Sequence, residues 1–230
     1  MKKSVSDIFW DFNVPMEGYC TWMYPDVKGL ISTGVGNLID PCLYAQILPW
    51  KHPDGTRATA VEVKAEWENL KHMPKECWAN GGGWFKSRTI LRLSESDVRI
   101  LVGQKLIQME TFLKGRFPDW DSYPADAQLA LLSMSWALGP AFRFPKFLAH
   151  LKARNWVGCA DECKMTETGN PGVIPRNKKN RQLFINAAAV EKHKLDPEKL
   201  YWPRALDVNQ EPEPEEQVCP TCNGTGRVKT

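Results

Sequence analysis

Residues 19–39 of this 230-residue chain place aromatic and β-branched side chains between Pro25, Gly29, Gly34 and Gly36. β-Branched and aromatic residues fit a pleated sheet, whereas Gly and Pro mark turns, so this stretch favours two or three short antiparallel strands. The segments around it have helical spacing. We therefore predict an α+β fold that is mainly helical, with one small antiparallel sheet near the N-terminus.

The first predicted helix covers residues 4–13, and Pro15 is expected to end it. Ser94 and Asp97 look like a capping box, which begins a long connecting helix that runs to about residue 114. Other helices are predicted at 59–72, 125–138 and 144–153, from about residue 156, and at 176–192, and the GGGW run at 81–84 is predicted as a loop.

Composition excludes several classes of protein. The formal net charge of +3 is too small to indicate a nucleic-acid binder. The N-terminus lacks the apolar run of a signal peptide, and no stretch approaches the roughly 18 apolar residues of a membrane span. The seven cysteines are odd in number and irregularly spaced, which argues against a disulfide framework. We expect a protein that is made in the cytoplasm and stays reduced there.

The chain divides into a large domain over residues 1–208, an acidic and Pro-rich linker at 209–218, and a short tail at 219–230. The tail contains CPTCNGTG, which resembles one repeat of the cysteine-rich zinc domain of the Hsp40 co-chaperones. That resemblance implies zinc binding by Cys219 and Cys222.

Two thiolates make only half of a zinc site, because zinc takes four ligands. Cys159 and Cys163 lie one helical turn apart and could complete the site if the linker folds back. A second copy of the chain could also complete it. The alternative is a disordered tail with two free thiols.

The chemistry of the N-terminal region centres on two carboxylates, Glu17 and Asp26, which are nine residues apart. Hydrolysis of a glycosidic bond needs an acid that protonates the leaving oxygen and a second carboxylate that directs water or attacks the sugar. Ser32 and Thr33 offer hydroxyl groups that could hold a water against Asp26. The spacing alone would also suit two ordinary surface charges.

The complete pattern, E-G-x5-Y-x-D-x2-G-x2-S-x-G-x-G-N-L, resembles the catalytic hairpin of the phage-type lysozymes, glycoside hydrolase family 24. The resemblance implies that Glu17 is the general acid, that Asp26 is the catalytic carboxylate, and that Ser32 positions the attacking water. Thr33 would take this last role if the register slipped by one residue. Asn37 stands where the family has a histidine.

Two later segments extend the resemblance. Residues 125–162 are similar to the buried central helix of the family and the helices after it, and residues 174–184 to its basic final helix. That helix carries an arginine near the glutamate. Arg181 is the best positional match, with Lys178 or Arg176 as less favoured alternatives.

The same alignment places Leu38 and Trp136 at the saccharide cleft, although Trp136 is equally suited to the core. The resemblance covers roughly residues 1–40 and 90–192, and 41–90 form an insert. The insert could supply extra saccharide subsites or a small sub-core with a flexible lid. Its tryptophans are Trp50, Trp67, Trp78 and Trp84.

The resemblance implies an N-acetylmuramidase that hydrolyses the β-1,4 bond between N-acetylmuramic acid and N-acetylglucosamine in bacterial peptidoglycan. It implies inversion, no cofactor for catalysis, a monomer, and an endolysin-like role in lysis of the host by a phage. Without a signal peptide, the enzyme would need a holin or a delivery machine to leave the cytoplasm of the producing cell.

Two alternatives belong to other functional classes. The first is a non-catalytic protein that binds cell wall or forms part of a virion on a lysozyme scaffold. The second is an interaction protein that acts through the zinc-knuckle tail.

Overall fold

The computed structural model describes residues 1–169 and 171–210. It is mainly helical, with a three-stranded antiparallel sheet near the N-terminus, which confirms the α+β prediction. The α-helices and strands are α1 (Lys3–Glu17), β1 (Cys20–Pro25), β2 (Ile31–Gly34), β3 (Asn37–Leu38), α2 (Leu43–Gln46), α3 (Ala60–Lys71), α4 (Glu95–Arg116), α5 (Ala125–Leu138), α6 (Pro145–Lys152), α7 (Trp156–Glu162) and α8 (Ile174–Lys192). Short 3-10 helices are η1 (Lys75–Asn80), η2 (Gly82–Arg88), η3 (Trp120–Ser122) and η4 (Pro171–Val173).

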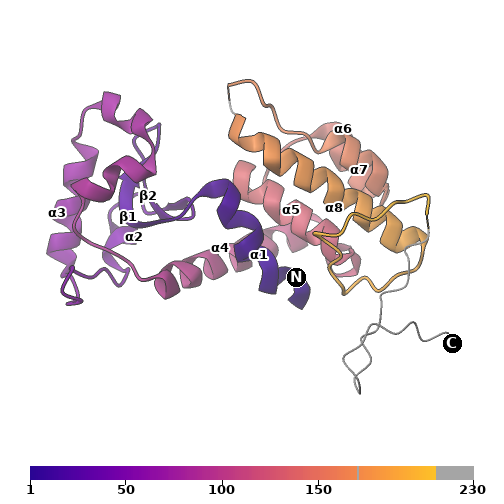
Figure 1. The fold of residues 1–230 in the computed structure, drawn as a ribbon, viewed down its shortest axis with the longest axis horizontal. Coiled ribbons are helices and arrows are strands. Elements are labelled where there is room, and N and C mark those ends of the chain that lie inside the picture. Colours follow the sequence, from indigo (N-terminus) through magenta and orange to yellow (C-terminus); the bar gives the residue numbers. More distant parts are fainter. Residues whose placement is uncertain (170, 211–230) are drawn as a thin grey trace, which may run out of the picture.

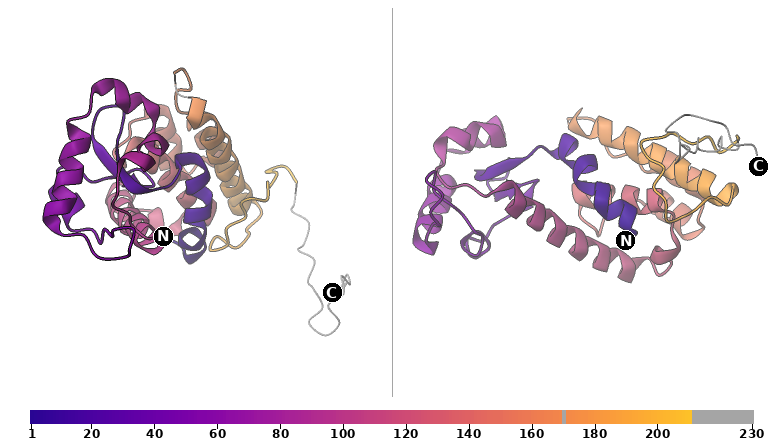
Figure 2. Two further views of the ribbon diagram at one scale, coloured as in Figure 1. Left: turned by 60° about the vertical axis from the view of Figure 1, so that its left-hand side comes forward. Right: turned by 60° about the horizontal axis from the view of Figure 1, so that its bottom comes forward.

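The elements form two groups joined by the long helix α4 (Figure 1). The sheet, α2 and α3 lie at one end of the molecule, and α5 to α8 lie at the other. The second view of Figure 2 shows α4 running the distance between the two groups. Helix α1 packs against α5, and its C-terminal end leads directly into β1. In the part of the chain that the structure describes, no helix is long and apolar enough to cross a bilayer.

Helix α1 corrects the prediction that Pro15 would end it, because the helix continues to Glu17 with Pro15 inside its last turn. Pro15 lacks the N–H that would pair with the Asp11 carbonyl, so the helix loses one intrahelical hydrogen bond but does not end there. Gly18 closes the helix in a positive-φ conformation, and its N–H donates to the Val14 carbonyl at 2.9 Å. Glu17 is therefore fixed by helical backbone on its N-terminal side.

Helix α4 begins where its sequence predicts. Ser94 accepts a hydrogen bond from the Asp97 N–H, and the Asp97 carboxylate accepts one from the Ser94 N–H, which is a reciprocal capping box. The helix ends at Arg116, close to the expected end. Thr59 and Glu62 form a second capping box, at the start of α3.

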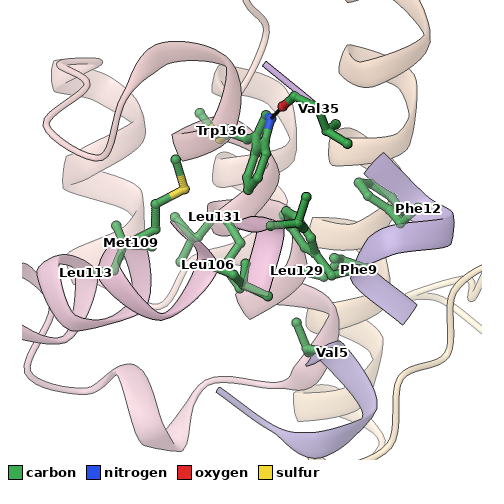
Figure 3. Close-up of a cluster of buried hydrophobic side chains, with 14 of the residues drawn as sticks. Val5, Phe9, Phe12, Val35, Leu106, Met109, Leu113, Leu129, Leu131 and Trp136 are labelled. Atoms are coloured by element: carbon green, nitrogen blue, oxygen red, sulfur yellow. Dashed lines mark hydrogen bonds between the residues drawn. The ribbon is translucent and has the colours of Figure 1, made fainter. Parts of the chain in front are cut away.

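The hydrophobic core is continuous between the two groups of elements. Helix α5 is buried on all sides from Ala125 to Trp136, as is typical of a central helix. Figure 3 shows part of this core, to which α1, α4 and α5 all contribute. The labelled core residues are Val5, Phe9, Phe12, Val35, Leu106, Met109, Leu113, Leu129, Leu131 and Trp136.

The insert at 41–90 belongs to the same core, because Ala45, Trp50 and Phe85 are fully buried in it. The Trp50 indole N–H donates to the Ala45 carbonyl at 2.9 Å. The GGGW run, predicted as a loop, lies in the 3-10 helices around Gly81. From its sequence, the insert is expected to supply either extra saccharide subsites or a small sub-core. The burial of Trp50 favours the sub-core.

Asp126 is a fully buried acid near the start of α5. Its Oδ1 accepts hydrogen bonds from the Asn186 amide at 2.8 Å and the Trp202 N–H at 3.1 Å, and its Oδ2 accepts one from the Tyr201 N–H at 2.9 Å. Burial raises the pKa of Asp126 to about 6, although these hydrogen bonds oppose the shift. Asp126 thereby ties the chain after α8 to the two central helices.

We predict that Asp126→Asn lowers the free energy of unfolding at pH 7.5 by about 2 kcal/mol, because the new NH2 group faces a backbone N–H that needs an acceptor. Urea denaturation measures this difference. Asp161→Asn, on an exposed side chain, is the matched control and should change stability by less than about 0.5 kcal/mol. Equal stability of the two variants would contradict the role of Asp126.

Candidate active site

Glu17 stands at the junction between α1 and the sheet, and its side chain is 25% exposed. Its Oε1 accepts a hydrogen bond from the Arg176 guanidinium. Its Oε2 faces Gly36, where a Cβ would lie only 3.8 Å away. The carboxylate is thus clamped at one oxygen, while the other lies against backbone that carries no side chain.

Arg176 is almost completely buried in the first turn of α8. Its Nη1 donates to the Asn13 side-chain oxygen at 3.1 Å, to the Ser133 carbonyl at 3.1 Å and to the Ser133 hydroxyl at 3.0 Å. A buried cation is costly unless it is paired and hydrogen-bonded. Acceptors from α1 and α5 therefore fix the guanidinium that holds Glu17.

This arrangement corrects the assignment of the arginine. Arg181, the favoured candidate, points away from Glu17, is 59% exposed and pairs with Asp161 at 3.4 Å. Lys178 is also exposed. Five residues along a helix correspond to about 140° of rotation, so Arg176 and Arg181 lie on different faces of α8. Arg176, the less favoured alternative, is the cation at Glu17.

Asp26 lies in the turn between β1 and β2. Its Oδ1 accepts hydrogen bonds from the backbone N–H groups of Lys28 at 2.8 Å and Leu30 at 2.9 Å. Its own N–H donates to the Leu30 carbonyl at 2.8 Å. These bonds fix the carboxylate, and its Oδ2 accepts no hydrogen bond from any described residue.

The Tyr24 phenol is within electrostatic range of both carboxylates. Burial raises the pKa of the Tyr24 phenol well above its usual value, and Cys20, Glu17 and Asp26 add to the shift. Both carboxylates therefore lie near one side chain. Tyr24 also pairs with Ser32 across the β1–β2 ladder, so the side chains of these two residues point to the same face of the sheet.

The ladder distinguishes the two neighbouring hydroxyl residues. The Thr33 side chain is fully buried, and its hydroxyl donates to the Trp22 carbonyl at 3.0 Å. The Ser32 side chain points to the opposite face and is 7% exposed. Its hydroxyl forms no hydrogen bond within residues 1–169 and 171–210. Ser32 is therefore the residue whose hydroxyl remains free to hold a water.

The two residues predicted at a saccharide cleft differ in their surroundings. Leu38 is 53% exposed and lines a groove between β3, α2 and α4. Trp136 is only 6% exposed, and its indole N–H donates to the Val35 carbonyl at 3.2 Å (Figure 3). Trp136 is thus a core residue, which was the alternative left open by the sequence.

The insert supports the β1–β2 hairpin from outside. The Trp78 ring covers Gly29, where a Cβ would lie 2.4 Å from the ring, so only glycine fits. The Trp22 indole N–H donates to the Gly82 carbonyl at 2.7 Å, and Gly82 also lies close to Tyr24. The GGGW run therefore packs against the strand that carries Tyr24.

Lys105, on α4, is a site residue that sequence reasoning missed. Its ammonium donates to the Gly36 carbonyl at 3.0 Å and lies 3.9 Å from the centre of the Trp136 ring. Burial lowers its pKa to about 8, while Glu17 opposes this shift and Arg176 adds to it. The sequence signal that points to it is its position next to Leu106, at the edge of the buried face of α4.

Of the possible zinc ligands, Cys159 and Cys163 lie in the described part of the chain. Cys159 and Cys163 are buried, and burial raises the pKa of both thiols to about 12, so each stays a packed thiol. Residues 1–169 and 171–210 contain no cluster of three or more potential metal ligands. Cys219 and Cys222 lie outside the described residues, so zinc binding by the tail stays a prediction.

No model of a known protein family matches this chain, and no curated protein sequence gives a significant match.

We predict that Arg176→Met lowers the free energy of unfolding by about 3 kcal/mol, because it leaves the buried oxygen acceptors and Glu17 without their donor. Arg181→Met, the matched control on the same helix, should cost less than about 0.5 kcal/mol, because its partner is exposed. Chemical denaturation of both variants measures the difference. The reverse order of stability would restore Arg181 as the structural cation.

Proposed function

We propose that this protein is a peptidoglycan N-acetylmuramidase with the architecture of the phage-type lysozymes. The observation that carries the proposal is the state of its two carboxylates. Glu17 is clamped at one oxygen by a buried arginine, and Asp26 is clamped at one oxygen by two backbone N–H groups. The second oxygen of each carboxylate accepts no hydrogen bond from a described residue, and the Ser32 hydroxyl, on the strand that pairs with Tyr24, is free as well.

In this mechanism Glu17 donates a proton to the glycosidic oxygen as the bond from that oxygen to the anomeric carbon breaks. Asp26 and Ser32 hold a water on the opposite face of the sugar. The water oxygen attacks the anomeric carbon, and Asp26 accepts its proton. Attack from the face opposite to the leaving group inverts the configuration, and the reaction needs no cofactor.

The non-catalytic alternative requires Glu17 to be turned out of the site or displaced by Pro15. Helix α1 instead continues through Pro15, and the Glu17 carboxylate lies at Gly36 with part of its surface exposed. The long helix α4 between a small sheet-containing end and a helical end also suits a lysozyme-like architecture (Figure 1). These features support the catalytic proposal over a purely structural one.

The resemblance to the phage-type lysozymes extends the proposal to an endolysin-like role in host lysis. The enzyme would act on the cell wall after release from the producing cytoplasm, through a holin or a delivery machine.

Glu17→Gln should reduce the clearing of outer-membrane-stripped Gram-negative cells by at least about 100-fold, because the general acid is lost. Turbidity measures the rate, and circular dichroism verifies the fold. Glu95→Gln, at an exposed glutamate on α4, should clear like the wild type. Equal clearing by wild type and Glu17→Gln would exclude this mechanism, and analysis of the released muropeptides identifies the bond that is cut.

Removing the hydroxyl group of Ser32 should affect the rate of clearing, whereas removing that of Thr33 should affect stability. Ser32→Ala is expected to lower the rate by about tenfold or more with little change in melting temperature, because its hydroxyl has no structural partner. Thr33→Val is expected to lower the melting temperature while the rate of the folded enzyme stays close to that of the wild type, because its hydroxyl bonds only to backbone. Parallel turbidity and thermal-unfolding assays test the pair. A greater loss of rate in Thr33→Val would reverse the assignment.

A further inference from the structure

A groove of about 460 Å³ lies next to the carboxylate site, between β3, α2 and α4. Its volume is typical of small-ligand sites. One wall is apolar and well exposed, with Leu38 at 53%, Tyr44 at 52% and Ile47 at 67% exposure. The facing helix contributes the side chains of Gln104 and Gln108.

Gly36 joins this groove to the carboxylate site. Its Cα faces the Glu17 carboxylate, while its carbonyl oxygen accepts the hydrogen bond from Lys105. A sugar bound at Glu17 would therefore have its substituents within reach of the groove. The groove and the carboxylate site can accommodate two parts of one ligand.

Lys105 is the charged residue among those that line the groove. Its ammonium carries three N–H donors and uses one of them for the Gly36 carbonyl. No described carboxylate forms an ion pair with Lys105, and the nearby Glu17 is already paired with Arg176. Among the described residues, the groove thus contains a partly desolvated cation that has no ion-pair partner of its own, which favours an anionic ligand group.

We propose that this groove binds the peptide stem of peptidoglycan and that Lys105 pairs with a carboxylate of that stem. This inference rests on the proposed function. The N-acetylated sugars of peptidoglycan are neutral wherever the lactyl group is amide-linked to the peptide, and the negative charges lie on the peptide. A neutral sugar would leave the Lys105 charge unpaired, whereas a peptide offers apolar groups, amides and a carboxylate to the matching groups of the groove.

The test measures the binding of a soluble disaccharide muropeptide that ends in reducing N-acetylmuramic acid, which has no bond for a muramidase to cut. Isothermal titration compares it with the same muropeptide after its carboxyl groups have been converted to carboxamides. A neutral oligomer of N-acetylglucosamine serves as the peptide-free ligand. The protein is the full chain with Glu17 intact.

For Lys105→Gln we expect about tenfold weaker binding of the anionic muropeptide, as for loss of a charge-assisted hydrogen bond. Lys105→Arg should keep most of the affinity. Lys114→Gln, which removes the same charge from α4 outside the groove, should bind like the wild type. Binding by the wild type should also weaken as the pH rises through about 8, where the free Lys105 loses its proton, while Lys105→Arg should not show this loss.

Three results would overturn the proposal. The first is equal binding of the anionic muropeptide by Lys105→Gln and the wild type. The second is an equal loss of affinity for the N-acetylglucosamine oligomer, which would make the groove a sugar site. The third is no preference of the wild type for the anionic over the amidated muropeptide. Clearing of cells by the wild type and not by Glu17→Gln would meanwhile leave the proposed function intact, so the two failures are distinguishable.

Discussion

The buried guanidinium of Arg176 is the constraint on which the candidate site depends. A cation that is almost completely removed from water requires acceptors from several directions. Here they come from Asn13 on α1, Ser133 on α5 and Glu17 at the end of α1. The same contacts that satisfy the charge also join three helices. The position of Glu17 is therefore set by the packing of the helical end of the molecule, and not by the hairpin alone.

The hairpin depends in turn on two glycines. Trp78 covers Gly29 too closely for any side chain, and Gly36, which has a positive φ, lies between the Glu17 carboxylate and the Lys105 ammonium. Residues 41–90 contribute to this arrangement as support, since the strand that carries Tyr24 packs against Gly82. The insert is thus part of the lobe that holds Asp26 and Ser32 in place.

Local interactions could be predicted because they depend on residues close together in the chain. The capping box at Ser94, the turns of the hairpin and the central helix 125–138 all follow from patterns of a few residues. The end of α1 differs from its prediction because it depends on a distant contact. A proline usually ends a helix, but packing against α5 keeps α1 helical up to Glu17 despite one missing donor.

The sequence by itself determined the fold class, the order of the main elements, and the presence of Glu17, Asp26 and Ser32 around one hairpin. Only the tertiary structure decided that Arg176 rather than Arg181 meets Glu17, that Trp136 is a core residue, and that Lys105 joins the site. The physical reason is that side chains distant in sequence are selected by the rotation of each helix about its axis. That rotation is set by burial of the whole core, and no local pattern specifies it.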